Sequence, residues 1–170
     1  MRRKFLLGLL AATLGVASLL SCGPYTFNPN LPGHIKSVAI PIFKNPRTFK
    51  YGLERKITTA LVDAFVRDGT LDVAAEAQAD AKLTGEVVSY KKEALSYDVT
   101  ESVKEYNLVV VVSVSFIDLT TGQVLYQDPN IYQAVSYYAV GPRAETEDEA
   151  LERLAEELAR KIVKRTLQGW

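Results

Sequence analysis

The sequence predicts an α+β fold, in which a mixed sheet of about four strands carries two helices on one face, in the order β-α-β-β-β-α. Two stretches repeat apolar residues every three or four positions, and long segments of alternating apolar and polar residues lie between them. A helix with one apolar stripe must bury that stripe, and the sheet is the surface available to both helices. The composition, 48% hydrophobic and 24% charged, is that of an ordinary globular protein.

The chain begins with a targeting segment. Three cations at positions 2–4 precede residues 5–20, which carry no charge, and this apolar run ends at Ser21 and Cys22. A basic start, an apolar run and a junction with a small residue are typical of an export signal. The run is shorter than the roughly 20 residues that span a membrane. We therefore predict a lipoprotein signal peptide at residues 1–21.

Cys22 is the only cysteine of the chain and stands at this junction. Its thiol is the group that a bacterial lipoprotein converts into a thioether carrying fatty acyl chains such as palmitate. One acyl chain binds a membrane reversibly, whereas two or three hold it stably. Gly23 follows, where an aspartate would favour the inner membrane, so we predict a lipid-anchored protein of the outer membrane. The alternative is an ordinary signal peptide or membrane anchor with an incidental cysteine.

Residues 22–34 are predicted to form a lipidated tether, because Pro24, Pro29 and Pro32 break regular structure. A single α+β domain is then expected over residues 35–170, a length that suits one domain with its own core.

The first half of this domain predicts a strand, a helix and a second strand. Residues 37–43 are β-branched and apolar, with Pro41 indicating an edge or a bulge. Residues 51–68 repeat apolar side chains every four positions and are followed by Gly69, which is typical of a helix C-terminus. A short strand is expected at residues 71–74.

Long alternating strands are predicted next, at residues 82–97 and 103–119, joined by a polar turn. One face of the second strand is apolar and the other is mixed, so we expect the mixed face to be partly covered or used. A further strand is predicted at 123–126, interrupted by residues 128–130 and resumed as a tyrosine-rich edge segment at 131–140.

The last helix has the clearest signals. Thr146 and Glu149 have the spacing of a capping box, and an apolar stripe follows. Acidic residues gather at its start and basic residues at its end, as the helix dipole favours. Three pairs have the spacing of intrahelical ion pairs: Glu149–Arg153, Glu156–Arg160 and Glu157–Lys161. We therefore assign these charges a structural role.

Groups for catalysis are scarce in this sequence. The one cysteine is assigned to lipid, and the one histidine, His34, lies in the predicted tether. The 20 cations balance the 20 anions, which argues against nucleic-acid binding. We therefore expect no enzyme activity, no cofactor and no metal site. Tyrosines on the strands suit an interface, or reflect only the preference of tyrosine for strands; both readings stay open.

The mature chain resembles the outer-membrane lipoprotein of lipopolysaccharide assembly, the subunit that plugs the β-barrel translocon for lipopolysaccharide. The resemblance covers nearly the whole mature chain and is carried by the order and spacing of several short motifs: CGPY (22–25), HIKSVAIPIFKN (34–45), FVRDG (65–69), ADAKLTGEVVSY (79–90), DLTTGQVLY (118–126) and the terminal GW (169–170).

This resemblance implies a non-catalytic protein that sits in the barrel lumen, supports barrel assembly and binds lipopolysaccharide. The domain would face the periplasm or the lumen. Basic residues near the strand turn and before the last helix are implicated in the family, and Lys104 and Arg143 occupy the matching regions. Lys91 and Lys92 are candidates by charge alone. The alternative is an outer-membrane lipoprotein that activates a periplasmic cell-wall enzyme or scaffolds an envelope secretion machine.

Overall fold

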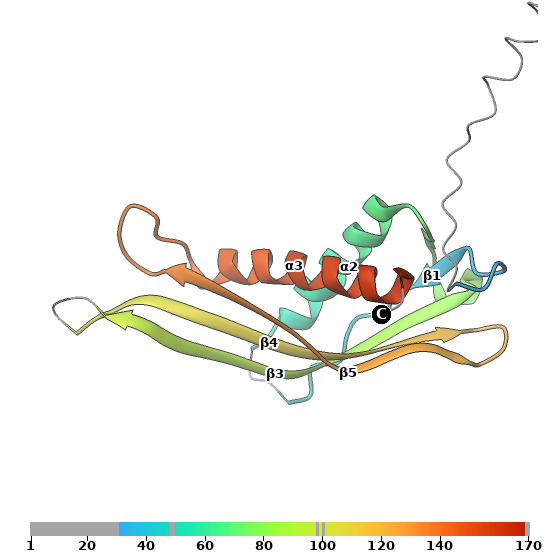
Figure 1. Cartoon of the computed structure of the whole chain (residues 1–170), viewed down its shortest axis with the longest axis horizontal. Helices are drawn as coiled ribbons and strands as arrows, with labels where there is room; N and C mark the ends of the chain where they lie inside the picture. The colour runs from blue at the N-terminus through green and yellow to red at the C-terminus, as the bar shows by residue number, and fades with distance from the viewer. Residues whose placement is uncertain (1–30, 48–49, 98, 100, 169–170) are drawn as a thin grey trace, which may run out of the picture.

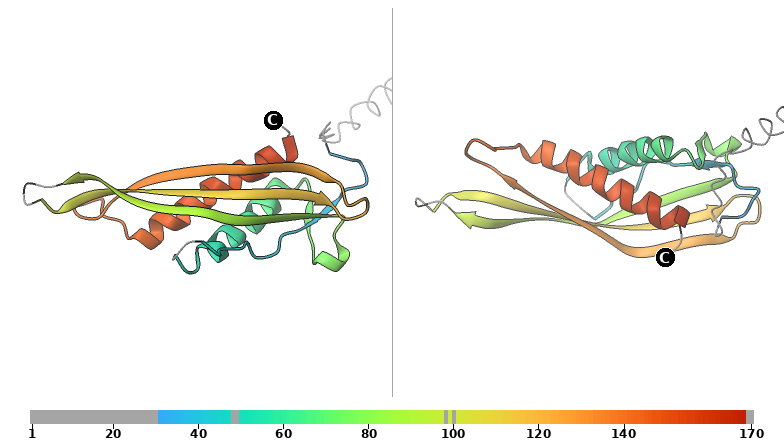
Figure 2. Two further views of the ribbon diagram at one scale, coloured as in Figure 1. Left: turned by 90° about the horizontal axis from the view of Figure 1, so that it is seen from below. Right: turned by 45° about the horizontal axis from the view of Figure 1, so that its top comes forward.

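The computed structural model describes residues 31–47, 50–97, 99 and 101–168. A twisted five-stranded sheet forms one layer, and two helices form a second layer on one of its faces (Figures 1 and 2). The elements are β1 (Ser37–Ala39), α2 (Leu53–Asp68), β2 (Asp72–Val73), the short 3₁₀ helix η2 (Glu76–Gln78), β3 (Ala81–Tyr97), β4 (Val103–Asp118), β5 (Val124–Tyr138) and α3 (Glu147–Gln168). The predicted α+β class and element order are confirmed, with five strands rather than about four.

The strands lie in the order β2-β1-β3-β4-β5. β1 pairs in parallel with β2 and with β3, while β3, β4 and β5 are antiparallel. The expected strand at 37–43 was therefore too long, and of the two alternatives at Pro41, an edge or a bulge, the edge position is wrong. β1 is an interior strand that ends at Ala39, so Pro41 lies beyond the ladder, where its missing N–H costs no strand pairing.

After β1 the chain returns to β3 through Lys44. The Lys44 N–H donates to the Gly85 carbonyl at 2.9 Å, and the Val87 N–H donates to the Lys44 carbonyl at 2.7 Å. Between these contacts the buried ring of Phe43 lies against Gly85. A Cβ atom at position 85 would stand 2.1 Å from Phe43 Cε2, so only glycine fits there.

β5 is one continuous strand, contrary to the predicted break at residues 128–130. Val112 pairs with Ile131 and Val114 with Asp128, so β5 uses one more residue than β4 over this stretch. The extra residue forms a β-bulge, which an edge strand accommodates together with Pro129. The turn-like sequence thus bends the strand without ending it.

The core lies between the sheet and the helices, as the two apolar stripes predict. The largest fully buried side chains include those of Ile57, Leu61, Phe65, Phe116, Leu151 and Leu154, and each contributes about 1.5–3 kcal/mol on burial. The predicted helix ends are also confirmed. The Gly69 N–H donates to the Phe65 carbonyl at 3.0 Å, and Thr146 and Glu149 exchange the hydrogen bonds of a capping box.

No helix among the described elements covers the other face of the sheet (Figure 2, left). Its centre on β4 carries Val109, Val111, Ser113, Ser115 and Ile117, all partly exposed. We call this surface the open face.

The two ends of the sheet differ. The β3–β4 hairpin reaches beyond the helices at one end, close to the loop that joins β5 to α3 (Figure 1). We call this the hairpin end. The described chain starts at the opposite end, beside the β4–β5 turn, which we call the tether end (Figure 1).

Candidate functional site: the hairpin end

Lys104 and Arg143, predicted from separate parts of the sequence, lie at the same end of the molecule. The Ala139 N–H donates to the Lys104 carbonyl at 3.0 Å, so the loop that carries Arg143 begins next to Lys104. The Arg143 guanidinium lies 5.7 Å from the centre of the Tyr138 ring. Both cations are exposed, and within the described residues neither forms an ion pair.

The acidic neighbour of Arg143 is already engaged elsewhere. Glu145 Oε2 accepts a hydrogen bond from Arg153 Nη2 at 2.7 Å. The charge of Glu145 is therefore compensated by Arg153 of α3. The guanidinium group of Arg143 stays available for another partner.

Exposed apolar side chains accompany these cations. Leu95, Tyr97 and Val99 on the β3–β4 hairpin and Val140 on the neighbouring loop rank among the exposed large hydrophobic residues. Tyr97 is one of the strand tyrosines for which the sequence left an interface role open, whereas Leu95, Val99 and Val140 were not predicted from the sequence. Leu95 is the extra residue at a register shift between Ala94 and Ser96, which strand alternation does not reveal. Cations beside exposed apolar side chains suit a ligand that carries both anionic groups and hydrocarbon.

Lys92 lies in a different environment, on the helix-covered side of the sheet. Its Nζ stands 2.7 Å from Glu147 Oε2 and 4.1 Å from the centre of the Tyr106 ring, and Tyr106 stacks on Tyr137 with ring centres 5.6 Å apart. Glu147 also pairs with Lys50. Tyr90 donates its hydroxyl to Glu147 Oε1 at 2.9 Å. We call this set the Glu147 cluster.

Contacts within the Glu147 cluster shift the pKa values of its members. Burial opposes ionisation of the Glu147 carboxyl, but hydrogen bonds from Lys50, Lys92 and Tyr90 outweigh it and lower its pKa to about 2. Burial likewise opposes the charge on Lys92, but the bond to Glu147 raises the pKa of Lys92 to about 12. Burial and Glu147 together raise the pKa of Tyr90. The cluster joins the segment before α2, β3 and the first turn of α3, so Lys92 has a structural task.

Lys91 points the opposite way. It pairs with Val109 in the β3–β4 ladder and belongs to the open face. The four predicted cations therefore divide into an exposed pair at the hairpin end, one residue on the open face and one inside the Glu147 cluster.

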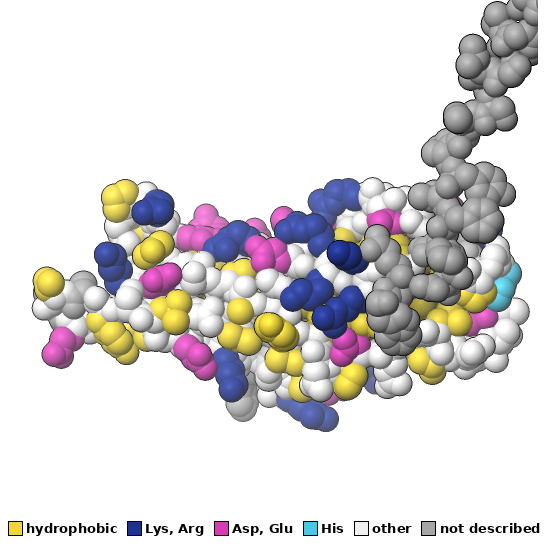
Figure 3. All heavy atoms as spheres, viewed as in Figure 1, with side chains coloured by type: hydrophobic (Ala, Val, Ile, Leu, Met, Phe, Trp, Pro, Cys, Tyr) yellow, Lys and Arg dark blue, Asp and Glu magenta, His cyan; other side chains and the backbone are white. Residues whose placement is uncertain are grey.

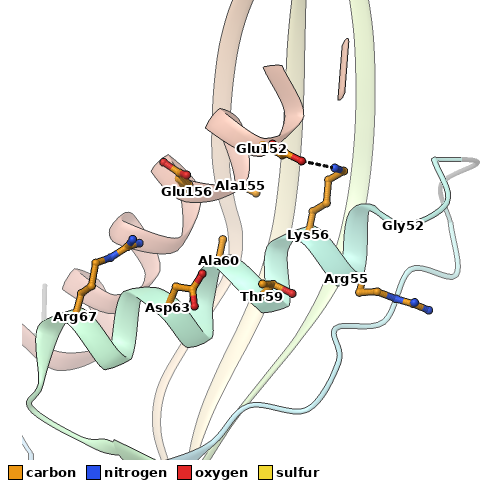
Figure 4. Close-up of a pocket in the computed structure, with 10 residues that line it drawn as sticks. All are labelled: Gly52, Arg55, Lys56, Thr59, Ala60, Asp63, Arg67, Glu152, Ala155 and Glu156. Atoms are coloured by element: carbon orange, nitrogen blue, oxygen red, sulfur yellow. Dashed lines mark hydrogen bonds and ion pairs between the residues drawn. The ribbon is translucent and has the colours of Figure 1, made fainter. Parts of the chain in front are cut away.

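A groove with a volume of about 470 Å³ lies between α2 and α3 (Figure 4). Lys56 closes part of it through ion pairs with Asp148 at 2.9 Å and Glu152 at 3.0 Å. The remaining charged side chains on its walls are Arg55, Asp63, Arg67 and Glu156. Cations and anions therefore balance on the walls of this groove.

A buried carboxylate fastens the start of the described chain at the tether end. His34 Nε2 lies 2.9 Å from Asp118 Oδ2, and Asp118 is only 2% exposed. The other Asp118 oxygen accepts the N–H groups of Thr120 at 2.7 Å and Thr121 at 3.2 Å. Burial opposes ionisation, but these bonds and the one to His34 lower the pKa of Asp118 to about 2. The sequence alone indicated no partner for His34, since the pairing joins distant parts of the chain.

Asp80 adds a second fastening beside the first. Its Oδ2 accepts the N–H groups of Lys36 at 2.9 Å and Ser37 at 3.0 Å, together with the Ser37 hydroxyl at 2.8 Å. These hydrogen bonds lower the pKa of Asp80. The predicted signal peptide, Cys22 and residues 23–30 lie outside the described residues. None of the helices within the described ranges is long and apolar enough to cross a membrane.

Figure 3 shows charged side chains of both signs over the surface that this view presents, with apolar side chains scattered along its length, some of them at the hairpin end. This distribution agrees with the exposed residues described above. The hairpin end is thus a region where sequence-predicted cations and exposed apolar side chains meet.

Comparisons with known proteins point to one family. The model of the LptE family, described as lipopolysaccharide-assembly, matches residues 35–166. A search of curated proteins gave no match.

Solved structures share the fold at low sequence identity. Lipoprotein B from Nitrosomonas europaea is 16% identical, with a TM-score of 0.55, covering 87% of this chain and 91% of that one. A putative lipoprotein from Caulobacter crescentus is 19% identical, with a TM-score of 0.51, covering 75% and 87%. A PelC dodecamer from Paraburkholderia phytofirmans is 18% identical, with a TM-score of 0.51, covering 88% and 96%.

Proposed function

The chain belongs to the LptE lipopolysaccharide-assembly family, and from this premise we propose that it plugs and helps assemble the β-barrel translocon that delivers lipopolysaccharide to the cell surface. It binds lipopolysaccharide at the hairpin end, without catalysis. Acyl chains on Cys22 hold it at the outer membrane, and the folded domain faces the periplasm or the barrel lumen.

The observation that carries this proposal is that Lys104 and Arg143 lie at the same end of the molecule, among exposed apolar side chains. Lipid A presents phosphate groups next to acyl chains. The phosphates match the cations of the hairpin end, and the acyl chains match its exposed apolar side chains. Lysine and arginine donate charge-assisted hydrogen bonds to phosphate oxygens. Leu95, Tyr97 and Val140 offer apolar surface at the same end, and each Å² removed from water contributes about 25 cal/mol.

The open face of the sheet suits the barrel. It mixes valines with serines on β4 and carries Tyr132, 64% exposed, on β5. Partner interfaces outside obligate dimers have this mixed character and are enriched in tyrosine. With both helices on the other face, the open face is free to lie against the inner wall of the barrel.

The test is a double charge reversal, Lys104→Glu with Arg143→Glu, in the full chain. We expect lipopolysaccharide binding to weaken about tenfold or more, because each lost charge-assisted bond is worth about 1.5–3 kcal/mol. The thermal unfolding midpoint should be unchanged, since both side chains are exposed. Lys36→Glu with Arg55→Glu is the matched control, because it reverses two exposed cations away from the hairpin end. Equal binding by both variants would exclude the hairpin end.

A second candidate function, as scaffold of an envelope secretion machine or activator of a cell-wall enzyme, draws on the similarity in fold to the PelC dodecamer. A pull-down of the full chain in mild detergent, read by mass spectrometry, separates the two. Recovery of a large β-barrel protein favours the translocon. Recovery of a ring of like copies or of a cell-wall synthase favours the alternative.

A further inference from the structure

β5 is an edge strand of the sheet, with no described strand on its outer side. In an antiparallel pair, every second residue directs its N–H and C=O groups away from the neighbouring strand. Such a row of unpaired groups is a template for another strand, and proteins usually blunt it. Whether another strand can add to β5 therefore depends on what its outward N–H and C=O groups contact.

Three successive outward carbonyls of β5 accept side-chain hydrogen bonds. Lys161 Nζ donates to the Tyr132 carbonyl at 2.7 Å. Gln133 Nε2 donates to the Ala134 carbonyl at 3.3 Å. Arg153 Nη2 donates to the Ser136 carbonyl at 3.0 Å. Positions 132, 134 and 136 alternate along the strand, which is the pattern that outward-directed groups require.

The side chains on this edge come from one stripe of α3. Arg153, Glu157 and Lys161 are four residues apart, which spaces them by about 6 Å along a helix. The carbonyls of alternate strand residues are spaced by about 6.8 Å. Helix and strand therefore stay in step over this stretch. Glu157 completes the row by holding Gln133, whose Nε2 donates to Glu157 Oε2 at 2.7 Å.

Two further contacts anchor the ends of the stripe. Arg153 also pairs with Glu145 at 2.7 Å, before α3. Arg165, one turn beyond Lys161, pairs with Asp128 at the bulge of β5 at 2.5 Å. Burial, and then the charge of Arg165, lower the pKa of Lys161, as expected for an ammonium group held against the strand instead of in open water.

We propose that Arg153, Glu157 and Lys161 form an edge cap that closes β5 to strand addition, and that the occupant it excludes is the β5 edge of a second copy of this chain. The outward groups are symmetric about Ala134. Two β5 edges can therefore pair antiparallel with Ala134 opposite Ala134 and Tyr132 opposite Ser136. The inference concerns self-association and does not depend on what the hairpin end binds.

The test removes the cap donors with Arg153→Ala and Lys161→Ala together, in the full chain purified in mild detergent. Light scattering that separates protein from detergent mass should give a doubled protein mass for this variant. The matched control is Arg160→Ala with Lys164→Ala, which removes the same charges from exposed positions of α3. Wild type and control should keep the mass of a single chain at the same concentration.

Adding Ala134→Pro to the uncapped variant identifies the surface involved. Proline lacks the N–H that the centre of a new ladder needs, and position 134 directs that group away from β4, so the β4–β5 pairing survives. We expect this triple variant to return to a single chain. Self-association that persists with proline, or that the control shows equally, overturns the proposal. So does a folded uncapped variant that stays monomeric.

A milder variant covers the case in which the double substitution melts the fold. Lys161→Met keeps the aliphatic stem and removes only the donor to the Tyr132 carbonyl. The Ala134→Cys substitution, combined with Lys161→Met, should give a disulfide-linked dimer under mild oxidation, since paired strands bring opposite Cα atoms within the range a disulfide spans. Ala134→Cys alone should give far less. Equal cross-linking in both, or none in either, overturns the edge cap.

Discussion

The Nζ atom of Lys92 lies 2.7 Å from Glu147 Oε2, so a cation in the middle of β3 is tied to the first turn of α3. Glu147 pairs at the same time with Lys50, from the segment that leads into α2. One partly buried carboxylate therefore joins three parts of the chain that are distant in sequence. Several consequences for stability can be measured.

Replacement of Glu147 by glutamine should lower the free energy of unfolding by about 1–3 kcal/mol, since Lys50 and Lys92 lose a charged acceptor. Urea unfolding followed by circular dichroism measures this. Glu156→Gln is the control, because its pair with Arg160 is exposed and spans 3.8 Å, and such pairs contribute about 0–1 kcal/mol. Equal losses in the two variants would contradict a special role for Glu147.

Acid should unfold the protein through carboxylates whose pKa is lowered in the fold. The pKa of Glu147 is held at about 2 against an ordinary 4.5, and that of Asp118 at about 2 against 3.8. A depressed pKa contributes stability that is fully present above the ordinary value and is lost as pH falls through the folded value. Unfolding free energies measured between about pH 5 and pH 2 should therefore decline steadily. The Glu147→Gln variant should decline less steeply, and an identical slope would argue against this assignment.

Gly85→Ala should destabilise the fold by about 1–3 kcal/mol, the usual cost of overpacking a core. The new Cβ atom would lie 2.1 Å from the Phe43 ring, which must move. Gly33→Ala is the matched control, because a Cβ atom there meets nothing within 4 Å. The thermal midpoints of the two variants, measured side by side, give the comparison, and a Gly85→Ala protein as stable as the control would show that the ring relaxes freely.

Cys22→Ser should move the protein from the membrane fraction to the soluble fraction of the cell envelope. Serine cannot form the thioether, and without acyl chains the anchor is absent. Cell fractionation and the mass of the N-terminal peptide measure this. Membrane association unchanged by the substitution would favour an uncleaved signal anchor instead.

Local signals made much of the fold predictable. The helix caps at Gly69 and Thr146 depend on residues a few positions apart, and the apolar stripes repeat within a turn or two. The short β1 and the continuous β5 were not predictable in the same way. Whether Pro41 or Pro129 ends a strand depends on which neighbour needs its N–H, and that is set by pairing with distant strands.

The charges of α3 show the same limit. Spacing predicted that Arg153 and Lys161 would pair within the helix, and only the Glu156–Arg160 pair is recorded in the described structure. Arg153 and Lys161 reach the edge of β5 instead. At the hairpin end, the resemblance supplied Lys104 and Arg143, and the structure placed them together. The task of Lys92 could not be anticipated, because it depends on how β3 and α3 are placed relative to each other.

The length of the β3–β4 hairpin has a consequence of scale. β3 has 17 residues and β4 has 16, and at about 3.3 Å per residue each strand reaches roughly 50 Å. A lipid bilayer with its headgroups is about 40–45 Å thick. With the acyl anchor predicted at Cys22, a rod of this reach can span the distance from one leaflet of a membrane to the other without unfolding or changing shape.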